Sequence, residues 1–142
     1  MDPGTTPHLR VTCAVIHRGG MILATQRGPG MKHPLKWEFP GGKVEPGERE
    51  EDGIIREIKE ELSISIRLTA QLEESTHDYG DVRITLVPFL ADFLAGEIVL
   101  HEHMSYRWLS PDELSHLDWA EADLPVVTSV VAYLASSQTG SM

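Results

Sequence analysis

The sequence is short of cysteine, of positive charge and of long apolar runs, and each shortage excludes a class of protein. The single cysteine, Cys13, cannot form a disulfide within the chain, and no base motif accompanies it, so we interpret it as a small buried hydrophobe. The chain has 12 Lys and Arg residues against 22 Asp and Glu residues, which gives a net charge of −10 at pH 7. Because binding to a nucleic-acid backbone needs clustered positive charge, we expect no nucleic-acid polymer as a partner.

No apolar run approaches the roughly 18 residues of a membrane-spanning helix, and no signal-peptide pattern opens the chain. We therefore expect a cytoplasmic protein with no membrane partner. The length of 142 residues suits one domain with its own core. We expect residues 1–8 to form a disordered tail, residues 9–136 one domain and residues 137–142 a polar tail. Both a monomer and a homodimer remain open.

Alternating and β-branched apolar runs predict several strands, and two segments near the end of the chain are predicted to be helices. The predicted strands are 11–16, 21–26, 64–72, 82–93, 97–100 and 105–109, with a polar loop at 73–80. Pro88 in the longest run indicates an edge strand or a bulge. Ser110 is placed to cap a helix that starts at Pro111, and residues 123–135 fit a terminal helix. Its predicted buried face is Val126, Val127, Val130, Val131 and Leu134. This order of elements predicts an α/β or α+β fold, with helices on the faces of a mixed sheet.

The most informative stretch is Gly41–Ile64, GGKVEPGEREEDGIIREIKEELSI. Its apolar positions recur at helical spacing on one face: Ile54, Ile55, Ile58 and Leu62. Glu57, Glu60 and Glu61 fall together on the flank of that face, where each like-charge pair costs a few tenths of a kcal/mol in an isolated helix. Such a cluster makes sense around a strongly positive ion, and Mg²⁺ prefers oxygen ligands of this kind.

The polar residues of this stretch follow a fixed spacing. They are Gly42, five residues, Glu48, seven residues, Arg56 and Glu57, an apolar residue, one further residue, then Glu60 and Glu61. This spacing resembles the Nudix box at every polar position. The one departure is Ser63, where the pattern has a glycine that lets the chain leave the helix with positive φ. The resemblance implies an α/β/α sandwich with a mixed sheet.

The likeness extends beyond the box, through WEFPGGKVEPGE, HEHMSYRWLSPDEL and DWAEADLPVV. These segments resemble the MutT-type subgroup, and within it the CTP pyrophosphohydrolases and 8-oxo-dGTP diphosphatases. The resemblance implies hydrolysis of a (deoxy)nucleoside triphosphate to the monophosphate and pyrophosphate, dependent on Mg²⁺, with Mn²⁺ as a substitute. The base remains open between cytosine in CTP or dCTP, a modified pyrimidine, and 8-oxoguanine.

The resemblance also implies which residues form the site. The implied metal ligands are the main-chain carbonyl of Gly41 and the side chains of Glu57, Glu60, Glu61 and Glu102. Glu57 is also our choice for the general base, with Arg56 and Glu48 positioning the carboxylates. Glu102 is equally well explained as a solvated loop charge. His101 and His103 flank it at a spacing that zinc can use, but no third nitrogen or sulfur ligand is near in the sequence.

Three further residues are candidate substrate contacts. Arg27 matches a position that holds a phosphate in MutT-type enzymes. Phe39 either stacks on the base or packs in the core. Asp123 either accepts from a base amino group such as cytosine N4 or caps the terminal helix. Gly53 in the helix either keeps room beside the metals or packs on the sheet.

A rival function is a catalytically silent Nudix-like domain that binds nucleotides for regulation. Such domains typically lose carboxylates of the box, and all of them are present here. The sequence therefore favours the enzyme.

Overall fold

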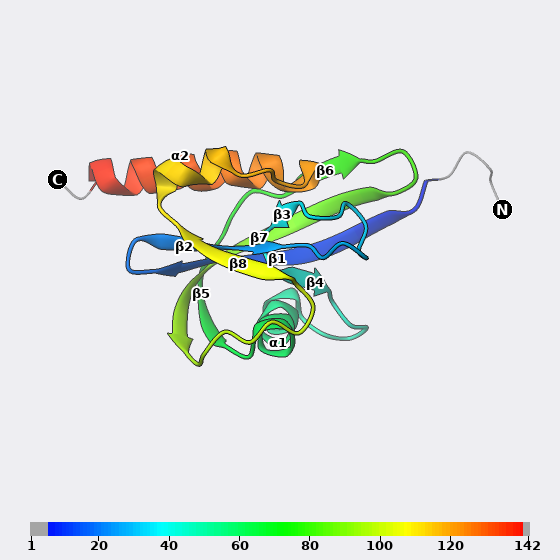
Figure 1. Ribbon diagram of the computed structural model, residues 1–142, viewed down its shortest axis with the longest axis horizontal. Helices are drawn as coiled ribbons and strands as arrows, with labels where there is room; N and C mark the ends of the chain where they lie inside the picture. Colours follow the sequence, from blue (N-terminus) through cyan, green and yellow to red (C-terminus); the bar gives the residue numbers. More distant parts are fainter. Residues whose placement is uncertain (1–5, 141–142) are drawn as a thin grey trace.

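The computed structural model describes residues 6–140, and their side chains to residue 136, as a mixed β-sheet with a helix against each face (Figure 1). The strands are β1 (His8–Arg18), β2 (Met21–Gln26), β3 (Trp37–Glu38), β4 (Gly41–Lys43), β5 (Ser65–Gln71), β6 (Ser75–Asp78), β7 (Arg83–Ala95) and β8 (Ser105–Leu109). The helices are α1 (Glu50–Leu62), the 3₁₀ helices η1 (Pro111–His116) and η2 (Glu121–Asp123), and α2 (Leu124–Gly140). The predicted mixed sheet between helices is confirmed.

The sheet is built around β1. Its path runs β3-β2-β1-β7-β5, while β4 pairs with β1, β6 with β7 and β8 with β2. β1 and β7 are parallel over ten residue pairs, and the other pairings are antiparallel. β7 is therefore an interior strand. Pro88 lies opposite the gap between the end of β5, which pairs with Phe89, and the start of β6, which pairs with Leu86. A residue without an N–H is tolerated there because no neighbouring strand requires its donor.

Alternate residues of β1 enter two separate cores, one under each helix. Cys13 and Val15 pack on the α2 side, whereas Ala14 and Ile16 pack on the α1 side. The buried position of Cys13 confirms its interpretation as a core residue.

Each helix buries most of the face that the sequence predicted. In α1, Ile54, Ile58 and Leu62 are fully buried. Burial of such side chains stabilises the fold by about 1.5–3 kcal/mol each. Ile55 and Val131 were expected to be buried but are 39% and 38% exposed. Each directly follows a buried residue and points about 100° away from it around the helix axis, which places it at the edge of the buried face.

Two segments differ from the prediction because of long-range pairing. Residues 75–78, expected as loop, form β6 because β7 offers them a partner. Residues 97–100, expected as a strand, are not one. They cross the C-terminal end of α1, where Val99 N–H donates to Leu62 O at 3.0 Å and His101 N–H to Glu61 O at 3.1 Å. Carbonyls at a helix end lack partners within the helix, so the crossing segment satisfies them.

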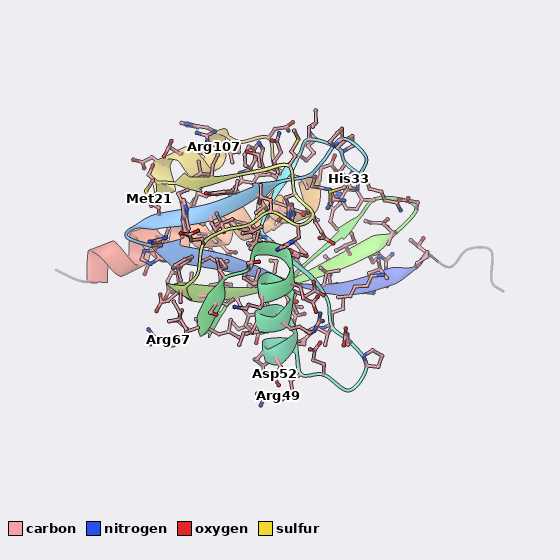
Figure 2. The ribbon with its side chains drawn as sticks, turned by 60° about the horizontal axis from the view of Figure 1, so that its bottom comes forward. Met21, His33, Arg49, Asp52, Arg67 and Arg107 are labelled. Carbon is pink, nitrogen blue, oxygen red and sulfur yellow. The ribbon has the colours of Figure 1, made fainter. Side chains whose placement is uncertain are left out.

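The helix α1 begins at the surface and ends in a left-handed turn. Figure 2 looks onto this helix, with Arg49 and Asp52 at its exposed N-terminal end. At the other end Ser63 has φ 60° and ψ 28°, and its N–H donates to Lys59 O at 3.0 Å. The left-handed exit expected of a glycine is thus made by a serine, whose Oγ lies 2.8 Å from Nε2 of His101.

The first strand and the last helix extend slightly beyond residues 9–136. β1 begins at His8, which was assigned to the N-terminal tail, and residues 1–5 lie outside the described part. α2 continues to Gly140, beyond the predicted start of the C-terminal tail at residue 137. Within residues 6–140, no helix is long and apolar enough to cross a membrane.

Candidate active site

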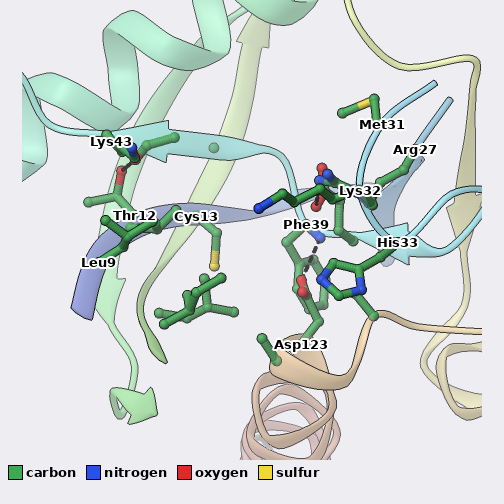
Figure 3. A pocket seen from close by; sticks show the side chains of 18 of the residues that line it. Leu9, Thr12, Cys13, Arg27, Met31, Lys32, His33, Phe39, Lys43 and Asp123 are labelled. Carbon is green, nitrogen blue, oxygen red and sulfur yellow. Dashed lines mark hydrogen bonds and ion pairs between the residues drawn. The ribbon is translucent and has the colours of Figure 1, made fainter. Parts of the chain in front are cut away.

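A cavity of about 320 Å³ opens on the α2 side of the sheet and extends to the end of α1 (Figure 3). Its apolar wall consists of Leu9, Val11, Cys13, Val82, Ile84 and Leu86. Its titratable lining consists of Arg27, Lys32, His33, Glu38, Lys43, Glu61, Tyr79, Glu102 and Asp123. An apolar wall with a few convergent polar groups is the usual form of a small-molecule site.

The glycine pair after β3 allows very close backbone packing at this cavity. A Cβ on Gly41 would overlap the carbonyl oxygen of Thr12 and lie 2.7 Å from the Cα of Cys13, so no side chain fits where β4 crosses β1. A Cβ on Gly42 would lie 2.7 Å from Cδ of Glu57. The carboxylate of Glu57 therefore lies directly against Gly42, which lines the cavity beside Gly41.

Glu61 is the most perturbed group of this end of the cavity. Burial, and then the negative charges of Glu102 and Glu57, raise the pKa of Glu61 to about 9. Its Oε2 atom is buried and has no hydrogen-bond partner. Glu61 is therefore protonated at pH 7 when nothing is bound, and its ionised form would be costly in this place unless something positive binds there.

The three box glutamates do not all face the same point. Glu57 interacts electrostatically with Glu61, and burial raises its pKa against the opposing effect of Arg56. Glu60 is largely exposed, and its Oε2 lies 3.0 Å from Nη1 of Arg56. Among residues 6–140, no three His, Cys, Asp or Glu side chains stand close enough, as oriented here, to hold a metal ion. The predicted cluster is therefore only partly assembled.

The donor set nevertheless fits a hard divalent cation. Glu61 and Glu102 bring carboxylate oxygens to one end of the cavity, and Glu57 lies beside them against Gly42. Glu38 is near enough to raise the pKa of Glu61 as well. Oxygen ligands of this kind suit Mg²⁺ and Mn²⁺. The unpartnered oxygen of Glu61 is the observation that supports this fit. Glu102, which the sequence left open as either a ligand or a solvated loop charge, lies at this end of the cavity.

Arg56 and Glu48 form the support beside the cluster. Nε and Nη2 of Arg56 donate to the two oxygens of Glu48 at 2.8 and 3.0 Å, a bidentate pair that raises the pKa of Arg56. A Cβ on Gly53 would lie 3.0 Å from Oε1 of Glu48 and 3.3 Å from Cγ2 of Val44. The missing side chain of Gly53 thus makes room for Glu48 and Val44.

Arg27 lines the cavity and is held in place by two acceptors. Its Nη1 donates to Oε1 of Glu38 at 2.8 Å, and its Nε donates to Lys32 O at 2.5 Å. The other oxygen of Glu38, Oε2, lies 2.8 Å from Nε2 of the buried His103. Sequence reasoning missed Glu38 as a site residue, although it lies within the WEFPGG segment, two residues before Pro40 and the glycine turn.

Phe39 and Asp123 meet in the lining of the cavity, as Figure 3 shows. Phe39 is 3% exposed and its ring packs 4.7 Å from that of Trp119, so core packing accounts for it while one part lines the cavity. Asp123 Oδ2 accepts the N–H of Phe39 at 2.9 Å. This hydrogen bond is made to the segment after β3 and not to the first turn of α2. Burial, and then the charge of Glu38, raise the pKa of Asp123 well above its usual value.

Tyr79 is a further lining residue that the sequence did not indicate. Its hydroxyl accepts the N–H of Ala122 at 2.9 Å, and its ring lies 4.3 Å from that of His33. The loop after Arg27 and the turn between β6 and β7 thus meet at the rim. No local pattern could have shown this, because β6 itself was not predicted.

Known proteins resemble the chain over most of its length. The NUDIX domain family matches residues 6–130. The CTP pyrophosphohydrolase of Escherichia coli K12 is 32% identical over 128 residues, which cover 90% of this chain and 95% of that protein. The 8-oxo-dGTP diphosphatase of the same strain is 30% identical over 123 residues, covering 86% and 95%.

Solved structures agree. The solution structure of the E. coli ORF135 protein has a TM-score of 0.81 at 33% identity and covers 94% of this chain and 95% of that one. The MutT structure from methicillin-resistant Staphylococcus aureus 252 has a TM-score of 0.73 at 36% identity, covering 91% and 99%. The box spacing, the sheet between two helices and these matches agree, and the chain belongs to the Nudix family of hydrolases.

Proposed function

We propose that the protein hydrolyses a (deoxy)nucleoside triphosphate to the nucleoside monophosphate and pyrophosphate, and that it requires Mg²⁺, for which Mn²⁺ substitutes. The observation that carries this proposal is the unpartnered buried oxygen of Glu61, among carboxylates at one end of a nucleotide-sized cavity. The names of the relatives, a CTP pyrophosphohydrolase and an 8-oxo-dGTP diphosphatase, support the reaction class.

The acidic end of the cavity is the proposed metal and phosphate site. Glu57, Glu61, Glu102 and the carbonyl of Gly41 would hold the cation, with Glu60 joining them after releasing Arg56. A divalent cation there supplies positive charge for the phosphates and makes a water more acidic. Glu57 accepts the proton of the attacking water, and Arg56 keeps that carboxylate in place from 3.2 Å.

The rest of the cavity is the proposed nucleoside site. Arg27 and Lys32 lie in the lining, at the start and in the middle of the loop between β2 and β3, and would contact phosphates. The apolar wall and Phe39 would contact the base, and Asp123 would accept from its amino group. Cytosine N4 offers such a donor, and so does the N2 amino group of 8-oxoguanine, so the proposed substrates are CTP, dCTP, a modified pyrimidine nucleotide and 8-oxo-dGTP.

We also propose that the protein acts in the cytoplasm on free nucleotides, as a monomer or homodimer, with residues 9–136 as one domain. Its net charge of −10 opposes binding to a nucleic-acid polymer. A silent regulatory domain remains the alternative function, and an assay of turnover separates the two.

The test is a panel of canonical, methylated and oxidised nucleoside triphosphates, incubated with and without Mg²⁺ and scored by product. We expect pyrophosphate and a monophosphate from at least one nucleotide, and loss of that activity when EDTA removes the metal. Release of inorganic phosphate with a diphosphate would contradict the proposed bond cleavage. Nucleotide binding without any turnover would support the regulatory alternative.

Asp123→Asn is expected to change the order of preference among bases. An amide offers a donor as well as an acceptor, and a well-placed base contact discriminates by about 1–3 kcal/mol. The ratio of kcat/KM between cytosine and guanine nucleotides should therefore shift about tenfold. The control is Asp118→Asn, because Asp118 is exposed and pairs with Lys36 at 2.7 Å outside the cavity lining. An unchanged ranking in Asp123→Asn, with lower stability, would show that Asp123 only holds Phe39.

A further inference from the structure

A buried histidine connects the two sides of the cavity through one carboxylate. The side chain of His103 is 2% exposed, and its Nε2 lies 2.8 Å from Oε2 of Glu38. Oε1 of the same Glu38 lies 2.8 Å from Nη1 of Arg27. Arg27, Glu38 and His103 therefore form a continuous chain, in which Glu38 has one partner on each oxygen.

The same histidine directly follows Glu102. On one side of Glu102 the backbone is held by the bond from His101 N–H to Glu61 O at 3.1 Å. On the other side Met104 N–H donates to Gln26 O at 3.0 Å, one residue before Arg27. Between these two backbone anchors Glu102 is exposed, whereas His103 is inserted into the protein. The contact of the His103 ring with Glu38 is thus a third attachment of the segment that carries Glu102, beside these two backbone bonds.

The hydrogen-bonding state of the ring agrees with this role. Nδ1 of His103 is buried without a hydrogen-bond partner. A buried lone pair without a partner costs less than a buried N–H, so the proton belongs on Nε2, where it is donated to Glu38. A histidine that only filled space would need no such directed contact with a carboxylate that also holds Arg27.

We propose that His103 is a positioning residue for the metal and phosphate sites. Its bond to Glu38 keeps the Glu102 loop and the Arg27 side chain in one relative arrangement, so that both face the cavity together. This inference rests on the proposed function, in which Glu102 binds the cation and Arg27 a phosphate. It assigns a role to a buried residue that does not line the cavity.

The test compares H103Q with H103N. Both are neutral amides, but the Gln amide reaches as far as Nε2 of the imidazole and the shorter Asn amide does not. Mn²⁺ binding, measured by electron paramagnetic resonance without nucleotide, should weaken by about tenfold or more in H103N, the usual effect of removing a group that orients a metal ligand. H103Q should recover most of that loss. KM for the triphosphate should rise more in H103N than kcat falls, because Arg27 is also released.

The matched control is H101L, on the other side of Glu102. His101 is exposed, its ring contacts Ser63 at 2.8 Å, and its backbone bond to Glu61 does not depend on the side chain. We expect H101L to bind Mn²⁺ within about twofold of the wild type. Thermal melting of all variants separates loss of folding from loss of positioning. If H103N fails to fold, the comparison of H103Q with the wild type still tests the proposal. The proposal requires H103Q to bind Mn²⁺ with near-normal affinity.

The outcomes are distinguishable. Wild-type protein that neither binds Mn²⁺ nor releases pyrophosphate would overturn the proposed function, and this inference with it. Wild-type binding that is equally strong in H103N would overturn the inference alone. Equal loss in H103N and H103Q would also overturn it, because the bond to Glu38 would then not be what matters.

Discussion

Replacing Glu57 by Gln is expected to slow pyrophosphate release by about 10²–10⁴-fold, the usual contribution of a positioned general base. The amide keeps the shape of the side chain, which lies against Gly42 and 3.2 Å from Nη1 of Arg56. It cannot accept the proton of a water, and it offers a cation no charged oxygen. The measurement is kcat under saturating nucleotide and Mg²⁺, with the melting temperature recorded alongside.

The control for this substitution is Glu51→Gln on the same helix. Glu51 lies in the first turn of α1 and pairs with Arg49 at 2.6 Å, outside the cavity lining. Its loss of charge should leave kcat within about twofold and change stability by less than about 0.5 kcal/mol. Turnover of the Glu57→Gln protein within a few-fold of the wild type would remove Glu57 from the proposed chemistry.

Replacing Gly41 by Ala is expected to destabilise the fold by about 3 kcal/mol or more, at the upper end of what overpacking costs. The added Cβ would overlap the carbonyl oxygen of Thr12 and stand 2.7 Å from the Cα of Cys13. Both are backbone atoms of the central strand β1, so no change of rotamer can relieve the contact. β4 would have to separate from β1, which would move the glycine turn away from Glu57. Urea unfolding measures the loss, and nucleotide turnover should fall with it.

Gly30→Ala is the matched control for this prediction. Gly30 lies in the loop after β2, a Cβ added to it would meet no heavy atom within 4 Å, and its φ is not in the left-handed region. Its substitution should change the free energy of unfolding by less than about 0.5 kcal/mol. A Gly41→Ala protein that unfolds at the same urea concentration as Gly30→Ala would contradict the close approach of β4 to β1.

The features that sequence reasoning predicted well are those set by local periodicity. Ile54, Ile58 and Leu62 recur at helical spacing and are buried under the sheet as expected. The same periodicity places Glu57 and Glu61 on one flank, where they interact. Because side-chain direction in a helix depends only on position along it, three or four residues are enough to predict which groups share a face.

The features that were missed depend on contacts between distant segments. β6 forms because β7 offers it a partner, and residues 97–100 are not a strand because they cross the end of α1. Glu60 was expected to face the cation site, but in the structure it pairs with Arg56. Asp123 was considered as a cap for its own helix, yet its carboxylate bonds to Phe39, 84 residues earlier.

By itself the sequence determined the fold class through the order of its strand and helix patterns, and the helix that carries the carboxylates through the spacing of its residues. The same spacing carries the resemblance to the Nudix family. The tertiary structure alone decided two further neighbours of the site: Glu38, whose charge raises the pKa of Glu61, and His103, which contacts Glu38 from 65 residues away. The physical reason is that a cavity is closed by strand pairing and loop crossing. Those depend on the free energy of the whole chain, and no single segment carries a signal for them.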